Sequence, residues 1–121
     1  MSIFEKIGGE PAVSAAVDLL YKKMLADPLL IPFFDGVAMS DLHRKQAWFL
    51  TTLLKGESVG ADSYMRMAHR RLVDRKGLSD EHFDAVTVHL EDSLRELDVP
   101  ESFITEIMSA AAALKDAVLD R

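Results

Sequence analysis

Residues 79–97 read SDEHFDAVTVHLEDSLREL, and their pattern of apolar and polar residues is helical. Its apolar residues at helical spacing are Phe83, Val86, Leu90, Leu94 and Leu97. They share one face of an α-helix, because the helix repeats every ~3.6 residues. Ser79 stands where an N-cap side chain begins a helix. The stretch therefore predicts a long amphipathic helix with one buried face.

The segments on either side show the same spacing. A further helix is predicted after Val99 and Pro100, and the short connection predicts an antiparallel hairpin. Its inward residues are Ile104, Ile107, Ala111, Leu114 and Val118. A shorter helix is predicted from Ser63 to Val73, before Gly77. Its inward residues are Met65, Ala68, His69 and Leu72.

The first half of the chain is also helical in pattern. Pro11 fits the first turn of a helix that ends near Asp27 and Pro28. Its inward residues are Val13, Val17, Leu20, Tyr21 and Met24. A brief helical turn carries Phe33 and Phe34, and Ser40 is expected to cap a helix that runs to about Lys55. No segment alternates like a strand, so we expect an all-α fold.

Length and composition narrow the class of protein. The 121 residues predict one domain, spanning 1–121. A net charge of −6 without a basic run argues against nucleic acid as a partner. The absence of cysteine excludes disulfides, thiolate metal sites and iron–sulfur clusters. No apolar run reaches the length of a signal peptide or a membrane span, so we expect a cytoplasmic protein that does not bind membranes.

Four polar side chains interrupt the predicted apolar faces. Tyr21 and His69 each lie on the inward face of their helix, and Lys45 and Gln46 do so between Ser40 and Lys55. An unpaired buried polar group costs about 1–3 kcal/mol, so each of them needs a partner. Hydrogen bonds within a packed core would satisfy them one by one. A flat apolar cofactor between the helices, such as haem, would account for them jointly.

The other histidines carry weaker signals. His82 and His89 are seven residues apart on one predicted face, but two imidazoles alone make a poor metal site. His43 lies one residue off the inward face and is expected to be solvated. The sequence contains no di-iron motif, H-E-x-x-H, Walker loop or G-x-S-x-G elbow.

Five motifs stand in the order of one family. They are Phe4-Glu5-Lys6-Ile7-Gly8-Gly9, Phe33-Phe34 before Met39, Gln46-x-x-Phe49-Leu50, Tyr64-Met65-Arg66-x-Ala68-His69 and Gly77-Leu78-x-x-x-His82-Phe83. On these motifs the chain resembles the group I truncated haemoglobins over nearly its whole length. The resemblance implies a two-over-two helical sandwich with haem between two antiparallel helix pairs.

The same resemblance implies the site residues. His69 becomes the proximal ligand of the haem iron. Tyr21 and Gln46 match the distal residues that stabilise the gas ligand, and Leu42 stands where a classical globin has its distal histidine. The remaining residues expected to contact haem are Phe34, Lys45, Phe49, Leu72, Phe83 and Val86.

Two positions depart from the family pattern. Many relatives have a Gly-Gly pair where this chain has Lys55-Gly56-Glu57, so the loop that follows is expected to differ in shape. Some cyanobacterial members carry a histidine that joins the haem covalently, and this chain has Leu114 there. We therefore expect haem b that is bound without a covalent link.

A pocket with these donors favours oxygen, because a tyrosine hydroxyl and a glutamine amide would hydrogen-bond the bound ligand. Carbon monoxide gains less from the same donors. Tight binding suits the reaction of oxygen with nitric oxide better than simple oxygen carriage, but whether the protein is an enzyme stays open, and no residue is assigned a catalytic role. Turnover would require a separate reductase, because the chain has no flavin or nicotinamide motif. We expect a monomer.

Two alternatives stay open. Lys45 would pair with a haem propionate, or else coordinate the iron as a neutral amine and produce a lysine-gated redox or electron-transfer protein. The second alternative is a non-haem helical interaction module, in which the polar groups of Tyr21, Gln46 and His69 hydrogen-bond one another in a packed core.

Overall fold

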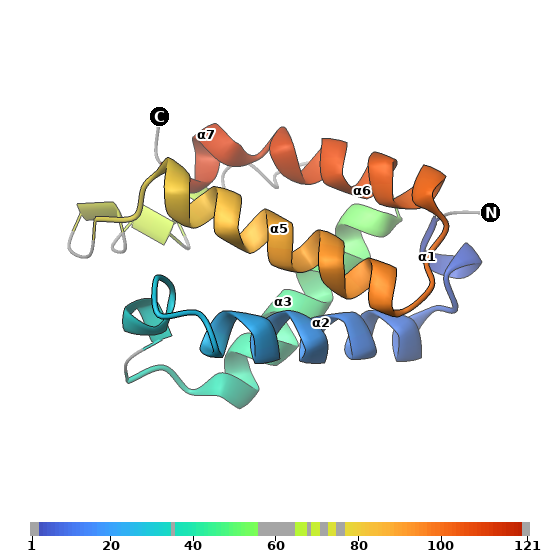
Figure 1. Ribbon diagram of the computed structural model, residues 1–121, viewed down its shortest axis with the longest axis horizontal. Coiled ribbons are helices and arrows are strands. Elements are labelled where there is room, and N and C mark those ends of the chain that lie inside the picture. Colours follow the sequence, from blue (N-terminus) through green and yellow to red (C-terminus); the bar gives the residue numbers. More distant parts are fainter. Residues whose placement is uncertain are drawn as a thin grey trace.

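The structure is a computed structural model that describes residues 3–34, 36–55, 65–67, 69–70, 73–74 and 77–119 (Figure 1). Within these residues the regular structure is helical, as predicted, and no strand occurs. The helices are α1 (Ile3–Lys6), α2 (Glu10–Leu25), η1 (Ile31–Phe34), α3 (Met39–Leu54), α5 (Asp80–Glu96), α6 (Glu101–Ala112) and α7 (Lys115–Val118). None of them is long and apolar enough to cross a bilayer.

Two helix pairs build the fold. α2 packs against α3, which crosses it obliquely, and α5 packs against α6 as the predicted antiparallel hairpin (Figure 1). α2 also packs directly on α5, so one pair lies against the other. The hairpin turns at Asp98, whose positive φ of 59° reverses the chain between Leu97 and Val99.

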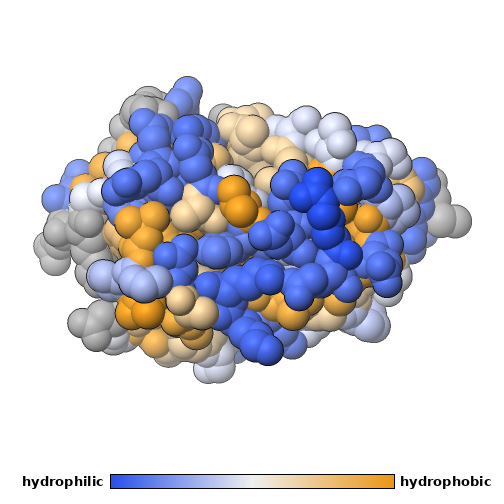
Figure 2. All heavy atoms as spheres, viewed as in Figure 1, coloured by the Kyte–Doolittle hydropathy of each residue, from blue (hydrophilic) through white to orange (hydrophobic). Residues whose placement is uncertain are grey.

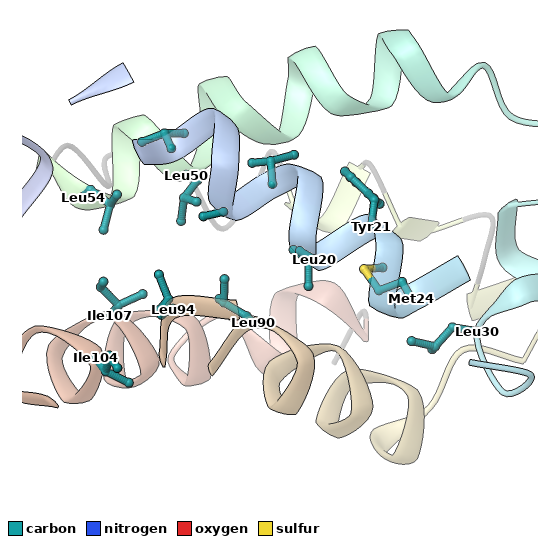
Figure 3. Close-up of a cluster of buried hydrophobic side chains, with 13 residues drawn as sticks. Leu20, Tyr21, Met24, Leu30, Leu50, Leu54, Leu90, Leu94, Ile104 and Ile107 are labelled. Atoms are coloured by element: carbon teal, nitrogen blue, oxygen red, sulfur yellow. The ribbon is translucent and has the colours of Figure 1, made fainter. Parts of the chain in front are cut away.

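The core lies where these four helices meet, and Figure 3 shows its side chains pointing at one another. Its largest fully buried apolar residues are Val13, Val17, Leu94 and Ile104. Ser93 is buried among them, and its hydroxyl donates to the carbonyl oxygen of His89 at 2.7 Å. No buried side-chain nitrogen or oxygen in the described part of the chain lacks a hydrogen-bond partner. The outer surface in Figure 2 is mainly polar, with scattered apolar side chains.

The predicted helix starts are largely confirmed. α2 begins at Glu10 with Pro11 in its first turn, and α5 begins at Asp80 with Ser79 as its N-cap. The backbone N–H of Ser79 donates to Nδ1 of His82 at 3.0 Å, which satisfies one of the donors exposed at a helix start.

Two predicted boundaries are wrong. α3 begins at Met39 instead of after Ser40, because Met39 packs against the core and the amide of Leu42 already bonds Ala38. The last helix does not run unbroken to Val118. It stops at Ala112 and resumes as α7, and the tighter turn places Leu114 against Phe49.

Candidate haem site

His69 is held by a bond to its own helical turn. Its Nδ1 lies 2.8 Å from the carbonyl oxygen of Met65, four residues earlier, and donates its proton there. That bond fixes the tautomer and leaves the lone pair of Nε2 for another partner. A carbonyl behind the imidazole is the arrangement that orients metal-ligating histidines in proteins.

The ionisation state of His69 also suits a ligand. Burial lowers the pKa of the imidazole, and the bond to the Met65 carbonyl opposes this more weakly. Near neutral pH the ring is therefore uncharged, which is the form that binds metal.

The described residues contain no group of three or more His, Asp or Glu side chains that could hold a metal ion. A single imidazole cannot chelate a free ion alone, whereas haem would bring its own ring nitrogens to the iron and would need only a ligand such as His69 from the protein. A lone neutral histidine among apolar helices therefore fits haem.

Tyr21 lies on α2 within the buried cluster, between Leu20 and Met24 (Figure 3). Its side chain is only 7% exposed. The ring meets that of Phe34 edge-on, with centroids 6.0 Å apart and planes at 90°. The structure thus brings together two of the predicted site residues, one from α2 and one from η1.

Phe49 connects α3 with the His69 segment. It is buried, and it packs with Leu114 and with the half-buried Met65 whose carbonyl holds His69. Leu114 therefore occupies the site as a packing residue, and its saturated side chain has no nucleophilic group for a covalent bond to haem. Gln46, three residues before Phe49 on α3, is half-buried.

The remaining predicted residues lie around this centre. Leu42 and Val86 are half-buried and pack against the core cluster. Phe83 is half-buried on α5, with the ammonium of Lys115 lying 5.7 Å from its ring centroid. Leu72 lies outside the described residues.

The prediction that the side chain of Lys45 points inward is wrong. It is exposed, although it follows the same helical spacing as its half-buried neighbours. A lysine stem can lie along an apolar surface while its ammonium reaches water, and this explains why periodicity alone placed it inward.

Sequence reasoning missed two polar contacts and one ring contact near these residues. His43 is half-buried instead of solvated, and its Nε2 lies 2.6 Å from Oδ1 of Asp18. His89 pairs with Asp27, and the ring of His82 packs on Phe33. The spacing of His43 and Asp18, each three residues before a predicted distal residue, is a signal that could have revealed the first contact. His89 and Asp27 are 62 residues apart, and nothing local in the sequence pairs them.

Comparison with known proteins agrees with this geometry. The family model for bacterial-like globins matches residues 2–120. The group 1 truncated haemoglobin of Synechocystis sp. is 41% identical over 112 residues, which cover 93% of this chain and 90% of that protein. The homologous protein of Chlamydomonas moewusii is 42% identical over 119 residues, covering 98% of this chain and 68% of its own.

Solved structures give the same result. The 2/2 haemoglobin of Synechococcus sp. PCC 7002, described with covalently attached haem, superposes with a TM-score of 0.88 at 33% identity over the full length of both chains. The ferric truncated haemoglobin of Tetrahymena pyriformis gives 0.82 at 35% identity, covering 98% of each chain. The two-over-two arrangement is therefore confirmed, and the non-haem interaction module is ruled out. The chain belongs to the bacterial-like globin family as a truncated haemoglobin, and its cofactor is haem.

Proposed function

We propose that this globin binds oxygen reversibly at haem iron ligated by His69, with Tyr21 and Gln46 donating hydrogen bonds to the gas. Haem supplies the iron at which a diatomic ligand binds. The observation that carries the proposal is Tyr21. It is a tyrosine 7% exposed within an apolar cluster, with its ring braced edge-on by Phe34. A braced ring holds its hydroxyl in one direction, so little entropy is lost when that hydroxyl donates.

The donors favour oxygen over carbon monoxide. A hydroxyl and an amide in a low-dielectric surrounding stabilise a polar ligand more than a weakly polar one. Leu42 adds a half-buried apolar side chain, one turn before Gln46, that offers no competing hydrogen bond. We therefore expect a pocket formed by Tyr21, Gln46 and Leu42 to release oxygen slowly.

The activity that we propose for such a site is nitric oxide removal. One nitric oxide, one oxygen molecule and one electron give nitrate, so the reaction consumes an electron in each turnover. The sequence contains no flavin or nicotinamide motif to supply that electron, so a separate reductase is part of the proposal.

The test is the rate of oxygen dissociation, measured by stopped flow. Tyr21→Phe removes the hydroxyl and keeps the ring against Phe34, and Gln46→Leu removes the amide. Each is expected to raise the rate about tenfold or more, because one such hydrogen bond contributes roughly 1.5 kcal/mol. Thr105→Val is the control, since it removes an exposed hydroxyl on α6. Unchanged rates in both site variants would contradict the assigned donors.

Lys45 supports a second candidate, the lysine-gated redox protein. It lies next to Gln46 on α3, is exposed, and has no ion-pair partner among the described residues. An amine without a carboxylate partner is available to act as a sixth ligand or to pair with a propionate. If Lys45 is the sixth ligand, the ferric protein has a low-spin absorption spectrum that Lys45→Ala abolishes, whereas a propionate partner leaves the spin state unchanged.

A further inference from the structure

Two histidines of α5 contact the segment that connects α2 with η1. Nε2 of His89 lies 2.9 Å from Oδ2 of Asp27, two residues after the end of α2. The ring of His82, two helical turns earlier on α5, meets the ring of Phe33 with centroids 4.8 Å apart at 68°. Residues 27–33 are thus tied to α5 at both ends. We call these two contacts together the histidine clamp.

The pair of His89 and Asp27 is more sheltered than an ordinary surface ion pair. The side chains are 21% and 22% exposed. Fully exposed pairs contribute little because water screens them, and this screening weakens as the pair becomes buried. The bond also joins residues 62 positions apart, so it fixes tertiary structure instead of one helix.

Asp27 stabilises the turn before η1 as well as the contact with His89 on α5. Its Oδ1 accepts the backbone N–H of Leu29 at 3.0 Å, and its carbonyl oxygen accepts the N–H groups of Leu30 and Ile31. Its carboxylate therefore shapes the entry to η1 with one oxygen and binds α5 with the other. The hydrogen bond from His89, and then that from Leu29, lower the pKa of Asp27, in keeping with both contacts.

His82 is fixed in turn at the start of α5. Its Nδ1 accepts the backbone N–H of Ser79, so its ring cannot rotate without breaking that bond. Nε2 lies 3.7 Å from a carboxylate oxygen of Glu81. The orientation of the ring that packs on buried Phe33 is therefore set by the helix start.

The clamp reaches the distal tyrosine through Phe34. η1 carries Phe33 and Phe34 as neighbours, and Phe34 is the residue that braces Tyr21 at 6.0 Å. We propose that Asp27, His89 and His82 are positioning residues, which hold η1 on α5 so that Phe34 keeps the Tyr21 hydroxyl aimed at the gas ligand. This inference rests on the proposed oxygen binding.

The test compares the C–O stretching band of the ferrous carbon monoxide complex with the oxygen dissociation rate. The frequency of the band depends on the hydrogen bond from a distal donor to the bound gas. If the clamp only stabilised the fold, its loss would leave this hydrogen bond, and therefore the band, unchanged. His89→Leu removes the tie to Asp27 and is expected to shift the band in the direction of Tyr21→Phe and to speed oxygen release at least threefold. His89→Gln retains a donor and should restore both values. Glu101→Gln, which alters an exposed pair with Arg95 between α5 and α6, is the control and should change neither.

A double-mutant cycle examines the route through Phe34. In a Phe34→Leu background, His89→Leu should have no further effect on the band, because the brace is already gone. Equal effects in both backgrounds would overturn the inference, as would a lowered Tm with an unmoved band. If His89→Leu does not fold, Asp27→Asn serves the same comparison. If Tyr21→Phe does not shift the band, the proposed function is contradicted. If Tyr21→Phe shifts the band and His89→Leu does not, only the role of the histidine clamp is contradicted.

Discussion

At the scale of single residues, hydrogen bonds decide what each candidate side chain can do. The Met65 carbonyl accepts a hydrogen bond from Nδ1 of His69, which suits this residue to the proposed role of ligand. The ring of Phe34 meets that of Tyr21, which suits the tyrosine to the proposed role of directed donor. The sequence indicated both residues by their polar character on apolar faces. It could not indicate Phe34 as the partner of Tyr21, since the direction of that ring depends on tertiary packing.

The carboxylate of Asp27 gives a prediction for acid stability. Its pKa in the folded protein is lowered, mainly by the hydrogen bond from His89. Its contribution is therefore complete above the pKa in the unfolded chain, about 3.9, and is lost as pH falls through the lower folded value. Urea unfolding of wild type and Asp27→Asn should differ at pH ~5, and the difference should narrow towards pH ~3. A difference that widens towards low pH would contradict the assignment.

At the scale of elements, periodicity predicted most of the helices, and tertiary contacts determined the rest. The α5–α6 hairpin, the cap at Ser79 and the short helix with Phe33 and Phe34 follow from local pattern and capping chemistry. The break before Leu114 does not, because a run of alanines favours continuing the helix. Contact with Phe49, 65 positions away, accompanies the break instead.

The inward face of α5 gives a prediction for stability. Leu94 is 1% exposed, whereas Val88 on the same helix is 53% exposed. Leu94→Ala is expected to lower the free energy of unfolding by about 2–5 kcal/mol, because it leaves a cavity among α2, α5 and α6. Val88→Ala should change it by less than about 0.5 kcal/mol. Equal losses in urea denaturation would show that the faces of α5 are assigned wrongly.

At the scale of the whole molecule, more of the fold than of the function can be predicted from the sequence. The five motifs, which include Gln46 and His69, identified the family, and the superposition on solved 2/2 haemoglobins confirms the arrangement of helices. The same motifs cannot predict the ties between distant helices, such as His89 to Asp27 and His43 to Asp18. The first tie joins α5 to the segment that follows α2, and the second joins α3 to α2.

We propose that His69 ligates haem in a protein that holds oxygen. The most direct measurement is the absorption spectrum of the ferric, ferrous and oxygenated forms of wild type and His69→Ala, with His43→Ala as a matched histidine control. We expect an intense band near ~400 nm and a stable oxygenated form in wild type and in the control. His69→Ala should lose normal ligation and recover it when imidazole is added. A His69→Ala protein with the wild-type spectrum and the same stable oxygenated form would show that His69 is not the ligand of the haem iron.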